Sequence, residues 1–185
     1  VETITNAATG AYTYKPNANA NGTDSFTFRA SDGLLSSNTG TVTVTISAVN
    51  DAPAPTAPAL AVNEDTAGTR QVAPNDPDAG NTHSYSITTV PLHGTASVSA
   101  TGLVSYTPAA NYFGSDTFSY TVTDGQQSAT GTVVVTVSSV NDPPVAHTGL
   151  TSIGPQDTPI AVQLSGTDPD GTVTAVTLSS APTNG

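Results

Sequence analysis

The feature that most constrains the fold of this chain is an internal repeat. Residues 9–33, TGAYTYKPNANANGTDSFTFRASDG, match residues 101–125, TGLVSYTPAANYFGSDTFSYTVTDG, at an offset of 92. The motifs EDT and DPD within residues 64–78 return as QDT and DPD within residues 156–170. Self-similarity at a fixed offset defines the folding unit before any residue propensity is considered. The unit is about 91 residues long.

A unit of this length divides the chain of 185 residues into one complete repeat and two partial ones. Residues 54–144 are expected to form the complete repeat. Residues 1–53 are expected to hold the last four strands of a preceding repeat, and residues 145–185 the first three strands of a following one.

Apolar and polar residues alternate with a period of two along the complete repeat, which predicts β-strands with one buried face. The buried positions are expected to be Val104, Tyr106, Phe118, Tyr120, Val122, Val133, Val135 and Val137. Seven strands are expected, near residues 59–62, 70–73, 83–89, 95–99, 103–107, 117–123 and 132–140. Seven short strands in about ninety residues predict an all-β fold of tandem seven-stranded Greek-key β-sandwiches.

The composition narrows the classes of partner. The chain has no cysteine, so it has neither disulfides nor thiolate metal ligands. Its formal net charge is -11, with only three Lys and Arg residues. So few cations cannot neutralise nucleic-acid phosphates, and no apolar run is long enough to insert into a membrane. We therefore expect no nucleic-acid partner and no membrane insertion.

The acidic residues gather at the two ends of the expected sandwich. Since successive strands run in opposite directions, each loop can be assigned to one end. The first end collects Asn50, Asp51, Asp76, Asp78 and Asp124. The second end collects Glu64, Asp65, Asp116, Asn141 and Asp142, and faces Asp168 and Asp170 of the next repeat.

Carboxylates that converge in this way repel one another and need a counter-charge. Ca²⁺ takes six to eight oxygen ligands in flexible geometry, whereas Mg²⁺ requires a tighter octahedron. The lack of Cys and the scarcity of His argue against zinc or copper. The sequence therefore predicts calcium sites at the ends of the repeats.

Several short motifs carry a family resemblance. VNDAP and VNDPP between repeats, NED before the second strand, DPD after it and TDG after the sixth strand resemble the bacterial cadherin-like and immunoglobulin-like tandem repeats of large secreted surface adhesins and other extracellular repeat proteins. The resemblance implies calcium between successive domains. It also implies ligands from the linker, the DPD motif, the Asp after the sixth strand and the acidic loops of the preceding domain.

Carried over to this sequence, the resemblance gives two sets of metal ligands. The first junction would use Asp24, Asn50, Asp51, Asp76, Asp78 and Asp124. The second would use Glu64, Asp116, Asn141, Asp142, Asp168 and Asp170. Gln156 stands where Glu64 stands in the complete repeat, and a single Asp precedes the sixth strand, so the number of ions at each junction stays open.

Other roles compete with metal binding. Asp and Asn are favoured turn residues, and a purely structural role for Asp24 and Asp116 is as well supported as a ligand role. His93 lies in a PLHG turn, and His83 and His147 lack a partner set typical of a catalytic base or a zinc site. No catalytic motif is present, so we expect no enzyme activity.

Together these patterns predict a structural spacer outside the cell, stiffened by calcium and serving adhesion or biofilm formation. Its expected partners are the neighbouring repeats of the same protein. Two alternatives stay open. In the first alternative, the chain is a subunit of a self-assembling filament or sheath, a homo-polymer in which one chain completes another. In the second, it is a module that binds a host or matrix glycan or protein. Tyr112 and Phe113 are then the best candidates for the binding patch.

Overall fold

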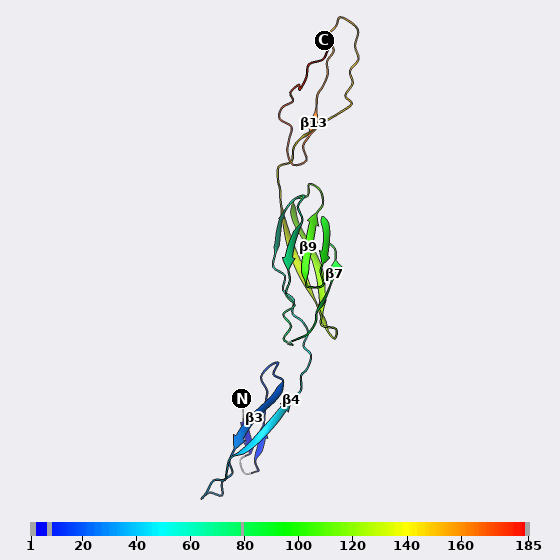
Figure 1. The fold of residues 1–185 in the computed structure, drawn as a ribbon. Coiled ribbons are helices and arrows are strands. Elements are labelled where there is room, and N and C mark those ends of the chain that lie inside the picture. The colour runs from blue at the N-terminus through cyan, green and yellow to red at the C-terminus, as the bar shows by residue number, and fades with distance from the viewer. Residues whose placement is uncertain (1–2, 7–8, 79, 184–185) are drawn as a thin grey trace. The chain divides into compact units, whose positions relative to one another are not determined.

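The computed structural model describes residues 3–6, 9–78 and 80–183, and every regular element in these ranges is a β-strand (Figure 1). Within this described part, the chain offers no helix that could cross a bilayer. Its residues cluster into two compact units. One comprises Val1–Pro55, Pro74–Ser84 and Val122–Ala129, and the other comprises Thr56–Ala73, Tyr85–Thr121 and Thr130–Gly185.

Seven strands form among the described residues of 54–144, as the alternation predicts. They are β5 (Leu60–Asn63), β6 (Gly68–Gln71), β7 (Ser84–Thr89), β8 (Gly94–Val98), β9 (Leu103–Pro108), β10 (Gly114–Thr123) and β11 (Ser128–Ser138). One sheet has the order β5-β11-β10-β7 and the other the order β6-β9-β8. The predicted all-β sandwich is confirmed.

The strand bounds differ from the expected ones mainly at β6, β10 and β11. β10 and β11 begin three and four residues earlier than expected, and the alternating burial continues through these extra residues. β6 begins and ends two residues earlier than expected. Val72, just after β6, is still 1 % exposed and its N–H donates to the Gly102 carbonyl.

The core of the sandwich consists of the side chains that the alternation predicts. All eight predicted positions are at most 3 % exposed, and they are Val104, Tyr106, Phe118, Tyr120, Val122, Val133, Val135 and Val137. The rings of Tyr106 and Phe118 are parallel, with centroids 6.2 Å apart. Leu60 and Val62 of β5 join the same cluster, so the first strand is anchored by its apolar face.

The pairing of β5 with β11 is parallel, with Leu60 opposite Val135 and Asn63 opposite Ser138. Parallel neighbours end at the same edge of a sheet. The residues that follow β5 and those that follow β11 therefore leave the sandwich at one end. The alternating directions assumed from the sequence predict this arrangement.

Four strands form among the described residues of the segment 1–53. β1 (Thr3–Asn6) pairs with β2 (Ala11–Thr13), and β3 (Gly22–Phe28) pairs with β4 (Gly40–Ile46). The ring centroids of Tyr12 in β2 and Phe26 in β3 lie 4.3 Å apart, so the two pairs of strands are in contact.

The third part of the chain is less regular. Two short strands form among its described residues, β12 (Val145–Ala146) and β13 (Gly166–Thr167). Ile153 is 98 % and Leu178 72 % exposed. Few apolar contacts therefore order this segment.

A glycine in β11 makes room for a core aromatic ring. A Cβ on Gly131 would lie 2.6 Å from the ring of Tyr120, which is fully buried. Gly40 and Phe28 are in the same relation in the first partial repeat, at 2.8 Å. We expect Gly131→Ala to lower the free energy of unfolding by about 1–3 kcal/mol, because overpacking forces a core side chain from its rotamer.

Urea unfolding measures this change, with Thr136→Ala on the exposed face of β11 as the control. The control should cost less than Gly131→Ala. Equal effects of the two variants would show that the glycine is not needed for packing.

Candidate metal site

A cluster of three carboxylates lies where β5 and β11 end. Glu64 and Asp65 follow β5, and Asp142 follows β11 along the linker to the third part of the chain. One carboxylate oxygen from each residue lies within 4.8 Å of the other two. The parallel pairing of β5 with β11 brings these residues together, although they are far apart in the sequence.

Glu64 is the most buried member of the cluster, at 2 % exposure. Its Oε1 accepts a hydrogen bond of 2.6 Å from the N–H of Val140, and its own N–H donates to the carbonyl of Ser138. Its Oε2 is buried and has no hydrogen-bond partner among the described residues. A buried carboxylate oxygen without a donor is costly, so Glu64 is suited to a cation.

Asp142 shares this property. Its Oδ2 is also buried without a partner in the part of the chain that the structure describes. Burial, followed by repulsion from Asp65, Glu64, Asp170 and Asp168, raises the pKa of the Asp142 carboxyl. The cluster is therefore an environment that disfavours negative charge in the absence of a cation.

Three other predicted ligands at this end, Asn141, Asp168 and Asp170, form hydrogen bonds that connect them to Asp142 directly or through one another. The Asp142 N–H donates to Asp170 Oδ1 at 3.2 Å, and the Asp170 N–H donates to Asp168 Oδ1 at 3.4 Å. These contacts attach the DPD motif of the third part to the linker. The side-chain amide of Asn141 donates to the Asp142 carbonyl at 3.1 Å.

Asp65 also belongs to the cluster. The sequence predicts that it lies at this end of the sandwich, but the resemblance does not include it among the metal ligands. Its backbone has a positive φ of 57°, and its Oδ1 accepts a hydrogen bond from the Asn111 N–H. The NED motif is the sequence signal for this arrangement. Its Glu64 and Asp65 are consecutive, and the left-handed backbone conformation of Asp65 lets both carboxylates reach one site.

Asp116 is buried, with 6 % exposure, and its carboxylate is already well supplied with donors. The N–H groups of Leu92, His93 and Thr117 and the hydroxyl of Tyr106 donate to its two oxygens at 2.8 to 3.1 Å. Burial by itself would raise the pKa of Asp116, but these donors outweigh it and lower the pKa. The structural role weighed for this residue is the role that its contacts support.

Residues predicted for the first junction also come together, at the end of the complete repeat that receives the first linker. The Asn50 side chain donates to Asp124 Oδ2 at 2.8 Å, and the Asp51 N–H donates to Asp78 Oδ2 at 2.7 Å. The Asp78 N–H donates to Asp76 Oδ1 at 2.9 Å. The predicted convergence of these residues is therefore present, with the linker bonded to both Asp78 and Asp124.

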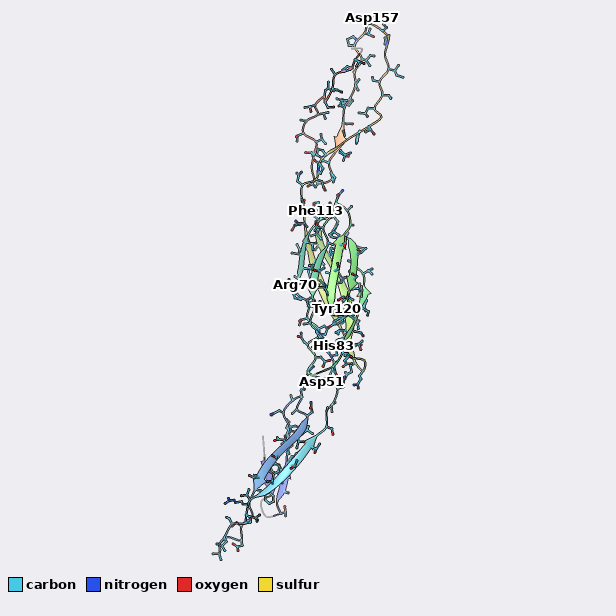
Figure 2. All side chains as sticks on the ribbon, in the orientation of Figure 1. Asp51, Arg70, His83, Phe113, Tyr120 and Asp157 are labelled. Atoms are coloured by element: carbon cyan, nitrogen blue, oxygen red, sulfur yellow. The ribbon has the colours of Figure 1, made fainter. Side chains whose placement is uncertain are left out.

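A histidine joins this first end, which the sequence did not indicate. His83 Nε2 lies 2.8 Å from Asp76 Oδ2, and Figure 2 shows His83 at the same end as Asp51. The N–H of Asp78, then His83, lowers the pKa of Asp76. The Gln127 N–H, then Asn50 and the Gln126 N–H, lowers the pKa of Asp124. Both carboxylates are thus stabilised as anions by protein groups.

Asp24 makes contacts within the first partial repeat. Its Oδ2 accepts a hydrogen bond from the Tyr14 hydroxyl and its Oδ1 from the Ser25 N–H, each at 2.7 Å. Its predicted role as a ligand of the first junction stays a prediction.

The expected aromatic patch divides into one packed and one exposed residue. Tyr112 stacks on His93 with ring centroids 4.1 Å apart, and its hydroxyl donates to the Ser115 carbonyl. Phe113 is 52 % exposed, and its side chain is labelled in Figure 2. Tyr112 therefore contributes to packing at the end of the sandwich, and Phe113 alone is available to a partner.

The hydrogen bonds of Asp116 lead to a test. We expect Asp116→Asn to lower the free energy of unfolding by about 1–3 kcal/mol at pH 7, because an amide NH₂ would face backbone N–H donors. The folded pKa of Asp116 lies below its ordinary value of 3.8, so its stabilisation is present above that pH. It is lost as the pH falls through the folded pKa.

Thermal unfolding from pH 7 down to pH 2 should therefore show the gap between wild type and Asp116→Asn closing below about pH 3.8. Asp157→Asn, an exposed change of the same charge, is the control. A gap that stays constant with pH would mean that the ionised carboxylate of Asp116 does not stabilise the fold.

Three comparisons with solved structures concern the fold alone. The chain is 19 % identical to human protocadherin-24 EC1-2, with a TM-score of 0.44 and coverage of 65 % of this chain and 67 % of that one. It is 19 % identical to Drosophila N-cadherin EC1-3, with a TM-score of 0.33 and coverage of 62 % and 43 %. It is 24 % identical to an endo-fucoidan hydrolase of glycoside hydrolase family 107, with a TM-score of 0.37 and coverage of 68 % of this chain. The chain spans only 20 % of that hydrolase.

A comparison with curated proteins found no match. A family model described as a bacterial Ig domain matches residues 2–45 and 50–136, which together are more than half of the chain. The match covers most of the complete repeat and most of the first partial one, in agreement with the resemblance and with the observed sandwich. The chain therefore belongs to the bacterial Ig domain family.

Proposed function

We propose that this chain is a calcium-stiffened spacer from a bacterial extracellular or cell-surface protein of the adhesin type. In this proposal residues 54–144 are one complete repeat, and residues 1–53 and 145–185 belong to its neighbours. The role is mechanical and not catalytic. The repeats keep a distant functional part of the protein away from the cell.

One observation carries the proposal. Glu64, Asp65 and Asp142 converge within 4.8 Å, and two of them bury a carboxylate oxygen that has no donor among the described residues. Among the described residues, no Lys or Arg side chain forms an ion pair with these three carboxylates. A bound cation would satisfy both buried oxygens and remove the repulsion that raises the pKa of Asp142.

The chemistry of these groups favours calcium. Every candidate ligand is a carboxylate or amide oxygen, and hard cations prefer oxygen. Ca²⁺ accepts an irregular shell of six to eight oxygens, whereas Mg²⁺ requires a near-ideal octahedron. Glu64, Asp65 and Asp142 would hold the ion, and Asn141, Asp168 and Asp170 are next to them for the remaining positions.

Calcium would act on the linker. Glu64 and Asp65 belong to the sandwich, Asp142 to the linker, and Asp168 and Asp170 to the third part of the chain. An ion shared by these groups restricts the linker, since moving it would break metal-oxygen contacts. Extracellular calcium modules respond at 10⁻⁴ to 10⁻³ M, so an environment outside the cell would keep the linker stiff.

A role in binding a glycan or protein has one observation in its favour. Phe113 is 52 % and Leu92 84 % exposed, in loops at the end of the sandwich that holds Asp116. Phe113→Ala would test this second candidate, since a binding module should lose retention on a glycan or cell surface. Assembly of chains into a filament stays a prediction from the sequence.

The calcium proposal predicts a stability change. At ten times its dissociation constant one ion adds about 1.4 kcal/mol, which raises Tm by several degrees. Thermal unfolding in chelator and in millimolar CaCl₂ measures the shift, with MgCl₂ at equal concentration as the control. Equal effects of the two salts, or no effect of either, would contradict a calcium site.

Glu64→Gln tests the cluster itself. The amide oxygen can still accept from the Val140 N–H, but the second oxygen becomes an NH₂ group that cannot bind a cation. We expect the variant to fold in chelator and to lose at least half of the calcium-dependent rise in Tm. Asp157→Asn, which removes one exposed carboxylate, should keep the full rise. If Glu64→Gln also keeps it, the ion binds elsewhere.

A further inference from the structure

We propose that the first linker is fastened to the complete repeat by a latch of protein groups that works without a metal ion. The latch consists of Asn50 in the linker and of Asp124, Gln126 and Gln127 at the tip of the β10–β11 hairpin. The two linkers of the chain then differ in kind. The claim about the first linker stands apart from the calcium proposal, and only the contrast with the second linker rests on it.

Asn50 is held through both its side chain and its backbone. Its Nδ2 donates to Asp124 Oδ2 at 2.8 Å, and its Oδ1 accepts from Gln126 Nε2 at 3.1 Å. Its backbone carbonyl accepts from Gln127 Nε2 at 2.8 Å. Three hydrogen bonds thus join groups 74 to 77 residues apart in the sequence. Both oxygens of Asn50 thus accept a hydrogen bond from a glutamine side chain.

The hairpin tip has the same backbone in the first partial repeat, with leucines in place of the glutamines. Asp124 Oδ1 accepts the N–H groups of Gln126 and Gln127 at 2.7 and 2.6 Å. Asp32 Oδ1 accepts the N–H groups of the equivalent Leu34 and Leu35 at 2.9 and 2.8 Å.

The glycines of the two tips also agree, since Gly33 and Gly125 both have a φ of 94°. The N–H of each glycine donates to the hydroxyl two residues earlier at 3.1 Å, Ser31 in one tip and Thr123 in the other. The tip therefore folds without glutamine side chains. Gln126 and Gln127 are available for a separate task, and their described side-chain contacts are with Asn50.

The rest of the first linker supports the latch. Asp78 accepts the Asp51 N–H, and the Asn75 side chain donates to the Ala54 carbonyl at 3.1 Å. None of the buried side-chain atoms without a partner in the described residues belongs to this end of the repeat. The second linker contrasts with it, because Glu64 Oε2 and Asp142 Oδ2 are both among those atoms.

The chain offers its own matched variant, Gln126→Leu with Gln127→Leu, which copies the tip of the first partial repeat. Hydrogen exchange of the Asp51 amide in chelator reports on the first linker. We expect slow exchange in wild type and about tenfold faster exchange in the double variant, the factor that about 1.4 kcal/mol produces. Gln163→Leu, in the third part of the chain, is the control and should change nothing.

Asn50→Ala provides a second route to the same result, since it removes the shared partner. Combined with the two leucine changes, it should speed Asp51 exchange little further, because all three changes break one latch. Slow exchange of the Val135 amide shows in each variant that the sandwich is folded.

Each result has one meaning. Unprotected Asp51 exchange in wild type with chelator, or unchanged exchange in the leucine variant, would overturn the latch. The Asp142 amide reports separately on the second linker, where calcium should slow exchange. If Asp142 does not respond to calcium while Asp51 stays protected in chelator, the calcium proposal fails and the latch stands.

Discussion

The parallel pairing of β5 with β11 is the constraint on which the candidate site depends. An antiparallel neighbour would carry the chain to the opposite end of the sheet, whereas β5 and β11 end at the same edge. Glu64 and the linker that leaves β11 therefore meet, and the Val140 N–H donates to Glu64 Oε1. The buried faces of the two strands fix their register, since Leu60, Val62, Val135 and Val137 share one core. The apolar core thus sets the register that brings the carboxylates together, and the hydrogen bond from Val140 to Glu64 adds to it.

The two ends of the complete repeat solve the same electrostatic problem in different ways. At the first end, protein groups form hydrogen bonds with the carboxylates. His83 and the Asp78 N–H contact Asp76, and the Asn50 side chain donates to Asp124. The pKa values of Asp76 and Asp124 are accordingly lowered. At the second end, the pKa of Asp142 is raised by burial and by neighbouring carboxylates. A spacer built in this way would combine a linker held by hydrogen bonds with one that responds to its ionic surroundings.

The sequence was sufficient for the fold and for the ends at which the acidic residues gather, because both follow from periodicity. An alternation of two identifies the buried Val, Tyr and Phe side chains of β9, β10 and β11, and alternating strand direction assigns each loop to an end. Individual partners could not be predicted, since they depend on local loop geometry. Asp65 joins Glu64 through a left-handed backbone, and Asp116 is enclosed by the N–H groups of the loop at residues 92–93. His83 and Gln126 have no motif that would reveal their partners across the fold.

The most direct test of the central claim observes the carboxylates themselves. Carbon-13 NMR of the Glu64 Cδ and Asp142 Cγ resonances during a calcium titration would follow two carboxylates that each bury an oxygen without a partner among the described residues. We predict that both resonances move together and saturate at millimolar calcium, while the Asp116 resonance, whose oxygens already accept hydrogen bonds, stays in place. Resonances of Glu64 and Asp142 that do not move, or that drift without saturating as they would with ionic strength alone, would contradict the account.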